Sequence, residues 1–372
     1  MNRSEPVLDM RSKDYPWMIY GASGLSGELI ARKAVAQGLR PILAGRDATA
    51  VRKLAEDLDL SWRSFEINDW GRFRREISPM NLLVNAAGPL MQTSVLVAES
   101  CLAAHTHYFD LNNQIPSLVA MYTLDAEAKE KNLTLLPGLA LSPAVSNCLV
   151  KHLHTLFPDA DAVDIALEPF MRRHSPGAHL TIVENILEGG FRRRGGFLER
   201  CWFGEGLIEM ELPTGSRRLF PGALGDIEAA YRCTGIPNIT AYIVTDISSF
   251  SNGVRRAAAP ASVHPLFNEF SRQPWDDKDT STSLVWVRMS KLGKRSLEGW
   301  IQFGEAHEFT AAVMVAGVSR LANNDPLSTG AHTPATALGA DFILDLPDVK
   351  RSVQPLKELN DVSAINELKT ND

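Results

Sequence analysis

"WMIYGASGLSGELIARKAVAQGLRPILAGR", residues 17–46, decides how the first part of this chain folds. Three glycines stand in it at G-x-x-G-x-x-G spacing. A short apolar run precedes them, a segment with helical periodicity follows, and a second apolar run ends near residue 45. The order strand, glycine turn, helix, strand predicts a βαβ unit with parallel strands.

Each glycine has a separate predicted task in this turn. Gly21 permits the tight turn, Gly24 lets the backbone approach a pyrophosphate, and Gly27 lets the helix pack closely on the strand. The start of the following helix offers free N–H groups to an anion. A dinucleotide site is therefore predicted, and a tight turn without ligand is the alternative. The predicted contacts in this turn are Gly21, Ala22, Ser23, Gly24, Leu25 and Gly27.

The end of the second strand indicates which dinucleotide binds. Sites for NAD carry Asp or Glu there to bond the ribose 2′-OH, whereas an arginine accommodates the 2′-phosphate of NADP. Arg46 occupies the position, with no acid before Asp47. We therefore expect NADP as cofactor, with NADPH preferred over NADH. A surface ion pair of Arg46 with Asp47 or Glu56 is the alternative.

The first 140 residues alternate strand-like and helix-like segments, which is typical of a doubly wound parallel α/β sheet. Strands are predicted at 17–21, 40–45, 61–67, 81–88, 106–111 and 133–138, and helices near 26–37, 48–58, 70–77, 93–104 and 116–131. Ligands bind outside the carboxyl ends of such strands. Topology therefore adds Asn68 and Asp69, near the adenine, and the small residues Ala86, Ala87, Gly88 and Pro89, near the nicotinamide ribose.

After about Leu141 the pattern changes to longer strand-like runs. "TSLVWVRMS" and "SLEGWIQFG", joined by "KLGKR", predict a hairpin, and residues 161–170 predict another strand. Helical periodicity returns at 305–322, and Thr333 is predicted to cap a helix that opens at Pro334. We expect a Rossmann domain over 1–141, completed by C-terminal helices within 305–372, and an inserted mixed α/β domain over 142–304. The charged tail past Pro347 is expected to fray.

Composition excludes several classes of protein. The chain has 372 residues, a formal charge of −6 and 45% hydrophobic residues, so a nucleic-acid partner is not expected. We expect no membrane span, because the apolar runs are too short, and a cytoplasmic location, because no secretion signal opens the chain. Four scattered cysteines without a C-x-x-C pair fit neither a disulfide scaffold nor a zinc site.

Several segments together resemble the saccharopine dehydrogenase-like oxidoreductases, including the trans-acting enoyl reductases. They are "YGASGLSG", "GLRPILAGR", "NAAGP", "CLAAHTHYFDL", "LPGLALSPAVSNCL" and "GAHTPATALGADF". The resemblance implies a Rossmann domain, an inserted α/β domain and a nicotinamide dinucleotide. It places the pyrophosphate on the glycine turn, the 2′-phosphate on Arg46 and the nicotinamide half near Ala87, Gly88 and Pro89. By analogy of fold, a homodimer through the inserted sheet is expected.

The chain also departs from this family. Asn113 and Gln114 stand where the family has a Gly-Glu pair, and "GLALSPAVSN" lacks the acidic residues that many members carry there. The predicted catalytic side chains are Tyr108 and Asp110, which share one face at the end of the fifth strand, where the nicotinamide is expected. A core position for Tyr108 and a capping role for Asp110 are the alternatives.

Substrate contacts are predicted at Ser142 and Asn147 and, for an anionic group, at His174 and Ser175. Capping by Asn147 and a solvated loop around His174 are the alternatives. No metal site is expected, because the histidine pairs lack further ligands at suitable spacing. The sequence thus predicts an NADP(H)-dependent oxidoreductase acting on a C=N, C=C or C=O bond of a small molecule. A dinucleotide-binding sensor or structural partner without turnover is the alternative.

Overall fold

The computed structural model describes residues 15–171, 190–201, 205–206, 208–244, 282–291, 294–323 and 327–358. The chain divides into two compact units. The first contains residues up to Asn112, residues 120–139 and residues 310–332. The second contains residues 113–119, 140–309 and 333 onward.

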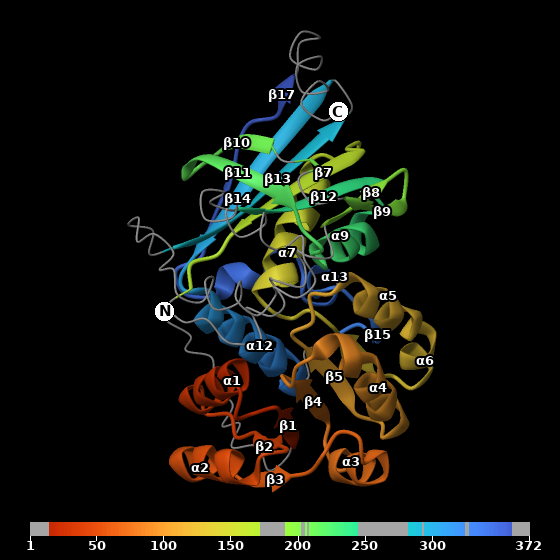
Figure 1. The fold of residues 1–372 in the computed structure, drawn as a ribbon, viewed down its shortest axis with the longest axis vertical. Coiled ribbons are helices and arrows are strands. Elements are labelled where there is room, and N and C mark those ends of the chain that lie inside the picture. The colour runs from red at the N-terminus through yellow and green to blue at the C-terminus, as the bar shows by residue number, and fades with distance from the viewer. Residues whose placement is uncertain are drawn as a thin grey trace, which may run out of the picture. The chain divides into compact units, whose positions relative to one another are not determined.

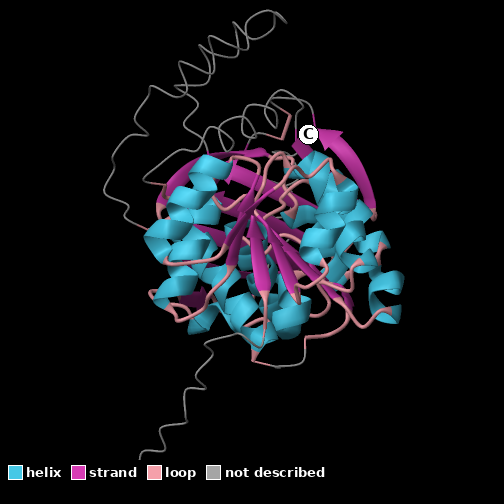
Figure 2. Cartoon of the chain, turned by 90° about the horizontal axis from the view of Figure 1, so that it is seen from below, coloured by secondary structure: helices cyan, strands magenta, loops and turns pink. Residues whose placement is uncertain are grey.

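The first unit is built on a parallel sheet of seven strands, in the order β15-β6-β5-β4-β1-β2-β3 (Figure 1). The order reverses beside β1, as in a doubly wound sheet, and helices cover both faces of the strands (Figure 2). The predicted fold class is confirmed. The strands are β1 Trp17–Tyr20, β2 Ile42–Gly45, β3 Trp62–Ser64, β4 Leu82–Asn85, β5 His107–Asp110, β6 Thr134–Leu136 and β15 Gly330–Ala331.

The helices of this unit follow the predicted ranges, with one division. They are α1 Leu25–Ala36, α2 Ala48–Leu58, α3 Trp70–Ile77, α4 Leu90–Ala103 and α6 Asp125–Glu130. Two more helices, α5 Ile115–Thr123 and α12 Ala306–Ala322, begin in the second unit and end in the first. The single helix expected near 116–131 is divided at Leu124 into α5 and α6. Side-chain caps fix two starts, because Asp47 accepts from the Ala50 N–H and Asp69 from the Arg72 N–H, both at 3.0 Å.

The second unit contains a mixed sheet. Its main path runs β10-β11-β12-β7-β13-β14-β16, while β17 pairs with β14 and β8 pairs with β9 and β12. The predicted hairpin is confirmed, since β13 and β14 are antiparallel partners. Ser283 lies opposite Phe303 at one end of the pair, and Lys291 lies opposite Arg295 at the other. The strands are β7 Ala162–Glu168, β8 Gly190–Arg194, β9 Phe197–Cys201, β10 Ile208–Leu212, β11 Gly215–Pro221, β12 Asn238–Val244, β13 Ser283–Lys291, β14 Arg295–Phe303, β16 Lys350–Val353 and β17 Lys357–Glu358.

The C-terminal boundary differs from the expected one. Only residues 310–332 join the first unit, whereas residues from Thr333 onward belong to the second. Hydrogen bonding explains this placement, because β16 pairs with β14 of the second unit. Val353 lies opposite Gly299, and Lys350 lies opposite Gln302. The expectation that the tail frays past Pro347 is therefore wrong as far as Glu358, where the described chain ends. The helices of the second unit are α7 Leu141–Leu156, α9 Asp226–Thr234 and α13 Pro334–Leu338, followed by a 3-10 turn at Phe342–Asp345.

The predicted cap of α13 is confirmed, because the Thr333 hydroxyl accepts from the Thr336 N–H at 3.3 Å. All four cysteines are free, and Cys101, Cys148 and Cys201 are buried. Within the part of the chain that the structure describes, no helix is both long and apolar enough to cross a membrane.

Candidate dinucleotide site and a buried polar cluster

The turn after β1 is tight and bonded to the neighbouring strand. Gly21 has φ +86°, a conformation that side chains disfavour. The N–H groups of Gly21 and Ala22 both donate to the Ala44 carbonyl of β2, at 2.8 and 3.0 Å, and the Gly24 N–H donates to the Gly21 carbonyl at 3.1 Å. The first glycine therefore makes the turn that the sequence predicts.

The other two glycines differ in what surrounds them. A Cβ on Gly27 would lie 2.2 Å from the Gly21 carbonyl oxygen, so the helix can start this close to the strand only without a side chain. A Cβ on Gly24 would meet only that same oxygen, at an ordinary 3.4 Å. Gly24 is exposed. The absence of a side chain at Gly24 therefore leaves solvent-accessible space in front of α1. No other part of the described protein packs into that space.

The start of α1 fits a phosphate. Gly24 is its N-cap residue and supplies no side-chain cap, whereas α2 and α3 are capped by aspartates. The first N–H groups of any α-helix lack intrahelical acceptors, and together with the helix dipole they favour an anion. Ser23, beside this start, is exposed, and Leu25 is half-buried. The glycine turn can thus hold the pyrophosphate of a dinucleotide.

Arg46 lies at the carboxyl end of β2 with its side chain exposed. Both ion-pair alternatives are absent: one carboxylate oxygen of Asp47 caps α2, and Glu56 pairs with Arg52 at 3.7 Å. Among the described residues the guanidinium of Arg46 has no hydrogen bond or ion pair. It is therefore available to an anionic group.

Asn68 and Asp69 follow β3 and are both exposed. The Asp69 Oδ1 atom accepts from the first turn of α3, so this oxygen already has a structural task. The Asn68 side chain is accessible to a ligand. Contact of either residue with an adenine stays a prediction.

The loop after β4 is small and open on one side. Ala86 and Ala87 are half-buried, Gly88 and Pro89 are exposed, and a Cβ on Gly88 would meet nothing within 4 Å. The Asn85 Oδ1 atom accepts from the Ala87 N–H at 3.1 Å and fixes the loop. Pro89 precedes α4 and gives it no side-chain cap. A second helix start without a cap therefore lies at this edge of the sheet.

Tyr108 and Asp110 form one buried network, which confirms that they share a face of β5. The Tyr108 hydroxyl donates to Asp110 Oδ2 at 2.8 Å and accepts from Asn85 Nδ2 at 3.2 Å. The Asp110 Oδ1 atom accepts from the Asn112 and Gly138 N–H groups, at 2.9 and 2.8 Å. All three polar side chains of the network, Asn85, Tyr108 and Asp110, are fully buried.

Burial also dominates the ionisation of this network. It raises the pKa of Tyr108 well above its usual value, with the nearby Asp110 carboxylate acting in the same direction. Burial raises the pKa of Asp110 as well, although the two backbone N–H groups oppose it. The side chains tie the ends of β4, β5 and β6 together, so the geometry supports the core and capping alternatives. A catalytic role for the pair stays a prediction.

In the second unit, Ser142 belongs to a polar cluster that the sequence did not indicate. Its hydroxyl accepts from Asn113 Nδ2 at 3.1 Å and donates to the Asp226 carboxylate, which Ser146 also contacts. Asp226 is fully buried, and burial raises its pKa, opposed by the two hydroxyls. In the sequence "GALGDIEAAY" this aspartate is of a type common at the start of a helix, so no local pattern indicates that it is buried in a polar cluster.

Asn147 is a buried cross-link within the second unit. Its Nδ2 donates to the Ala229 carbonyl at 3.0 Å and its Oδ1 accepts from the Ala335 N–H at 2.8 Å. The side chain is 1% exposed, so it supports packing of α7, α9 and α13. The predicted contacts His174 and Ser175 lie outside the described residues.

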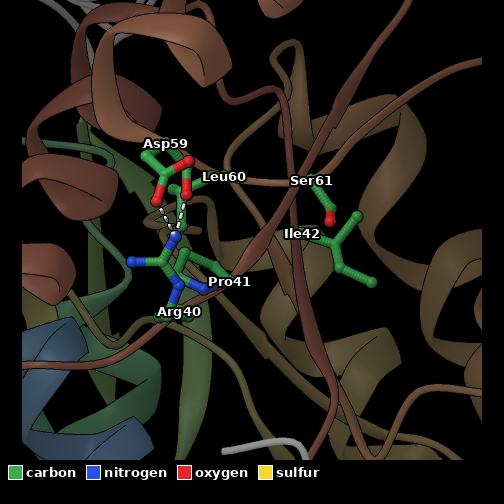
Figure 3. Close-up of a pocket in the computed structure, with 6 residues that line it drawn as sticks. All are labelled: Arg40, Pro41, Ile42, Asp59, Leu60 and Ser61. Carbon is green, nitrogen blue, oxygen red and sulfur yellow. Dashed lines mark hydrogen bonds and ion pairs between the residues drawn. The ribbon is translucent and has the colours of Figure 1, made fainter. Parts of the chain in front are cut away.

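A pocket of about 330 Å³ lies at the amino ends of strands β2 and β3 in the first sheet (Figure 3). It is lined by Arg40, Pro41, Ile42, Asp59, Leu60 and Ser61. These residues precede or open β2 and β3, whereas dinucleotides bind at the carboxyl ends. Arg40 and Asp59 form an ion pair across it, at 2.8 Å. Within the described ranges, no group of three or more His, Cys, Asp or Glu side chains could hold a metal ion.

Comparison with solved structures identifies the fold. Neither a protein-family model nor a curated protein matches the chain. Apo histidine-tagged saccharopine dehydrogenase (L-Glu forming) from Saccharomyces cerevisiae matches with a TM-score of 0.63 at 9% identity, over 91% of this chain and 100% of that one. GenD2 from gentamicin A biosynthesis, in complex with NAD, matches with a TM-score of 0.45 at 12% identity, over 95% and 99%. The match to saccharopine dehydrogenase shows that the chain has that fold, as the sequence resemblance implied.

Proposed function

We propose that this protein is an NADP(H)-dependent oxidoreductase that transfers hydride to or from a C=N, C=C or C=O bond of a small molecule. One observation carries the proposal. The carboxyl edge of the first sheet combines an uncapped helix start behind the glycine turn with an arginine that has no partner among the described residues. The shared fold with saccharopine dehydrogenase, a dehydrogenase by its name, supports the same class of reaction.

In this proposal the residues of the chain bind and orient, while the nicotinamide supplies the hydride chemistry. The first-turn N–H groups of α1 hold the pyrophosphate. Arg46 pairs with the 2′-phosphate, for which an always-charged, forked guanidinium is well suited. The open loop from Ala86 to Pro89 leaves room for the nicotinamide ribose. Asn85, locked by the Tyr108–Asp110 network, keeps that loop in place.

Calorimetric titration with NADPH and NADH tests the proposal. We expect NADPH to bind more tightly, and Arg46→Ala to lose about 1.5–3 kcal/mol of NADPH binding, roughly 10- to 150-fold, while NADH affinity stays unchanged. Arg52→Ala is the matched control, because Arg52 is an exposed arginine on α2 that pairs with Glu56. Should neither nucleotide bind the wild-type protein, the glycines form a turn only and the proposal is wrong.

A second candidate is a dinucleotide-binding sensor or structural partner without turnover. The specific observation in its favour is that both predicted catalytic side chains, Tyr108 and Asp110, are fully buried and bonded to each other. Monitoring NADPH absorbance with a panel of imines, enones and ketones separates the two candidates. Tight NADPH binding without oxidation by any member of such a panel would favour the sensor.

A further inference from the structure

Ser64, the last residue of β3, joins two arginines at the edge where Arg46 lies. Its register partner on β2 is Gly45, directly before Arg46. The Ser64 hydroxyl donates to the Arg46 carbonyl at 3.1 Å, and the Ser64 carbonyl accepts from Arg72 Nη2 at 2.7 Å. One residue thus fixes the backbone of Arg46 and the guanidinium of Arg72, although the two arginines are 26 positions apart.

The helix that carries Arg72 is itself held firmly. Phe73, its neighbour on α3, is fully buried and packs edge-on against Tyr20 and Phe65, with ring centroids 5.7 Å from each. Asp69 caps the same turn. Arg72 therefore approaches Ser64 from a fixed backbone, and its guanidinium is placed in advance of any ligand.

The guanidinium group of Arg72 is only partly paired with carboxylates. The Arg72 side chain is 48% exposed, and its carboxylate partner is Glu76, at 3.7 Å. Glu76 is shared, because Arg63 lies closer to it, at 3.0 Å, and also donates to its carbonyl. A single carboxylate therefore faces two guanidinium groups, and Arg46 adds a third cation nearby. Asp47 and Asp69 each give an oxygen to a helix cap, and between Trp62 and Glu76 the other acid is the exposed Glu66.

We propose that Arg72 is a second cation for the 2′-phosphate of NADP(H), and that Ser64 sets its position relative to Arg46. The inference rests on the proposed function and deepens it, since it assigns a further specificity residue for the cofactor. Arg72 uses Nη2 for the Ser64 carbonyl and directs Nε to Glu76, and its Nη1 has no partner among the described residues. Two guanidinium groups match the charge of about −2 on a phosphate monoester.

The test compares Arg72→Gln, Arg46→Ala and the double variant by titration with NADPH and NADH. We expect Arg72→Gln to weaken NADPH binding about 10- to 150-fold and to leave NADH binding within about twofold, as for loss of one charge-assisted contact. The double variant should bind both nucleotides equally. Arg74→Gln is the matched control, because Arg74 is an exposed arginine of the same helix, and both affinities should stay unchanged.

Adenosine 2′,5′-bisphosphate and 5′-AMP, titrated into the same variants, isolate the 2′-phosphate from the nicotinamide. Arg72→Gln should weaken the bisphosphate alone. If it weakens both adenine ligands equally, or leaves the NADPH preference intact while Arg46→Ala removes it, the assignment of Arg72 is wrong and the proposed function stands. If wild-type protein binds none of the four ligands, the proposed function itself is wrong. Thermal unfolding of each variant without ligand shows whether the fold is retained.

Discussion

A Cβ atom on Gly21 would lie 2.6 Å from the backbone nitrogen of Ala87. The turn after β1 and the loop after β4 are therefore in direct backbone contact, with no side chain between them. These two segments follow neighbouring strands at the point where the strand order reverses, which is where doubly wound sheets bind their ligands. The glycine at 21 is thus required by packing as well as by its positive φ.

Substitution of the first two glycines should separate folding from binding. Gly21→Ala adds a clash and a strained φ, so we expect it to lower the free energy of unfolding by about 2 kcal/mol or more and to abolish NADPH binding. Gly24→Ala meets only an ordinary contact and should fold normally, yet bind NADPH at least about tenfold more weakly, because its methyl group occupies the pyrophosphate position. Urea unfolding and calorimetry measure the two effects. Normal NADPH affinity in Gly24→Ala would contradict the assigned site.

The buried network on β5 should act mainly on stability. Tyr108→Phe leaves Asn85 and Asp110 each without one partner in a fully buried environment, so we expect a loss of about 1–3 kcal/mol in the free energy of unfolding. NADPH affinity should change only slightly. Denaturant titration and nucleotide titration of the same sample check this. Full stability combined with complete loss of turnover would instead give Tyr108 the catalytic role.

Stability of the second unit should depend on the ionisation of Asp226. Because burial raises its pKa in the folded state, the folded protein holds this proton more tightly than the unfolded chain does. The tighter proton binding of Asp226 contributes fully to stability below the usual pKa of 3.8. This contribution is lost as the pH rises from 3.8 through the raised pKa of the folded state. Across that range the free energy of unfolding should fall by up to about 1.4 kcal/mol per pH unit.

Asp226→Asn removes this titration, so its free energy of unfolding should depend less steeply on pH than that of the wild type as the pH rises above about 4. Urea unfolding at several pH values measures both slopes. Asp159→Asn is the control, since Asp159 is 71% exposed and pairs with Arg295 at 3.5 Å. Equal slopes for wild type and Asp226→Asn would contradict the prediction.

Asn147 should prove structural. Asn147→Ala removes bonds to the Ala229 carbonyl and the Ala335 N–H and leaves that N–H, in the first turn of α13, without a partner in the core, so we expect a loss of about 2–4 kcal/mol in the free energy of unfolding. Thr155→Ala, an exposed position on the same helix, should cost less than about 0.5 kcal/mol. Thermal unfolding compares them. An unchanged melting temperature with a raised substrate KM would restore Asn147 as a substrate contact.

Local patterns predicted the features that depend on local geometry. Three spaced glycines, an arginine after an apolar run and a threonine before Pro334 each determine a turn, an exposed cation or a cap within a few residues. The cluster around Asp226 could not be predicted in this way, because Ser142 is 84 positions from it and every partner is an ordinary residue in its own segment. The proposed role of Arg72 could not be predicted for the same reason, because the hydrogen bonds that connect it to Arg46 through Ser64 depend on the pairing of β2 with β3.

The expected fray of the C-terminal tail failed for another reason. "KRSV" at 350–353 is too polar and too short to indicate a strand by itself, and the edge of β14 supplies its hydrogen-bonding partner. An edge strand has backbone N–H and C=O groups without partners, so it can pair with a segment whose own sequence has no preference for a strand.

The chain passes between its two units at residues 112–113, 119–120, 139–140, 309–310 and 332–333. Two of these passages fall inside continuous helices, at 119–120 in α5 and at 309–310 in α12. No single cut of the polypeptide releases either unit as one piece, so neither can be exchanged for a foreign module by joining genes at one seam. Engineering of this protein toward another substrate must therefore proceed by substitutions inside an undivided chain.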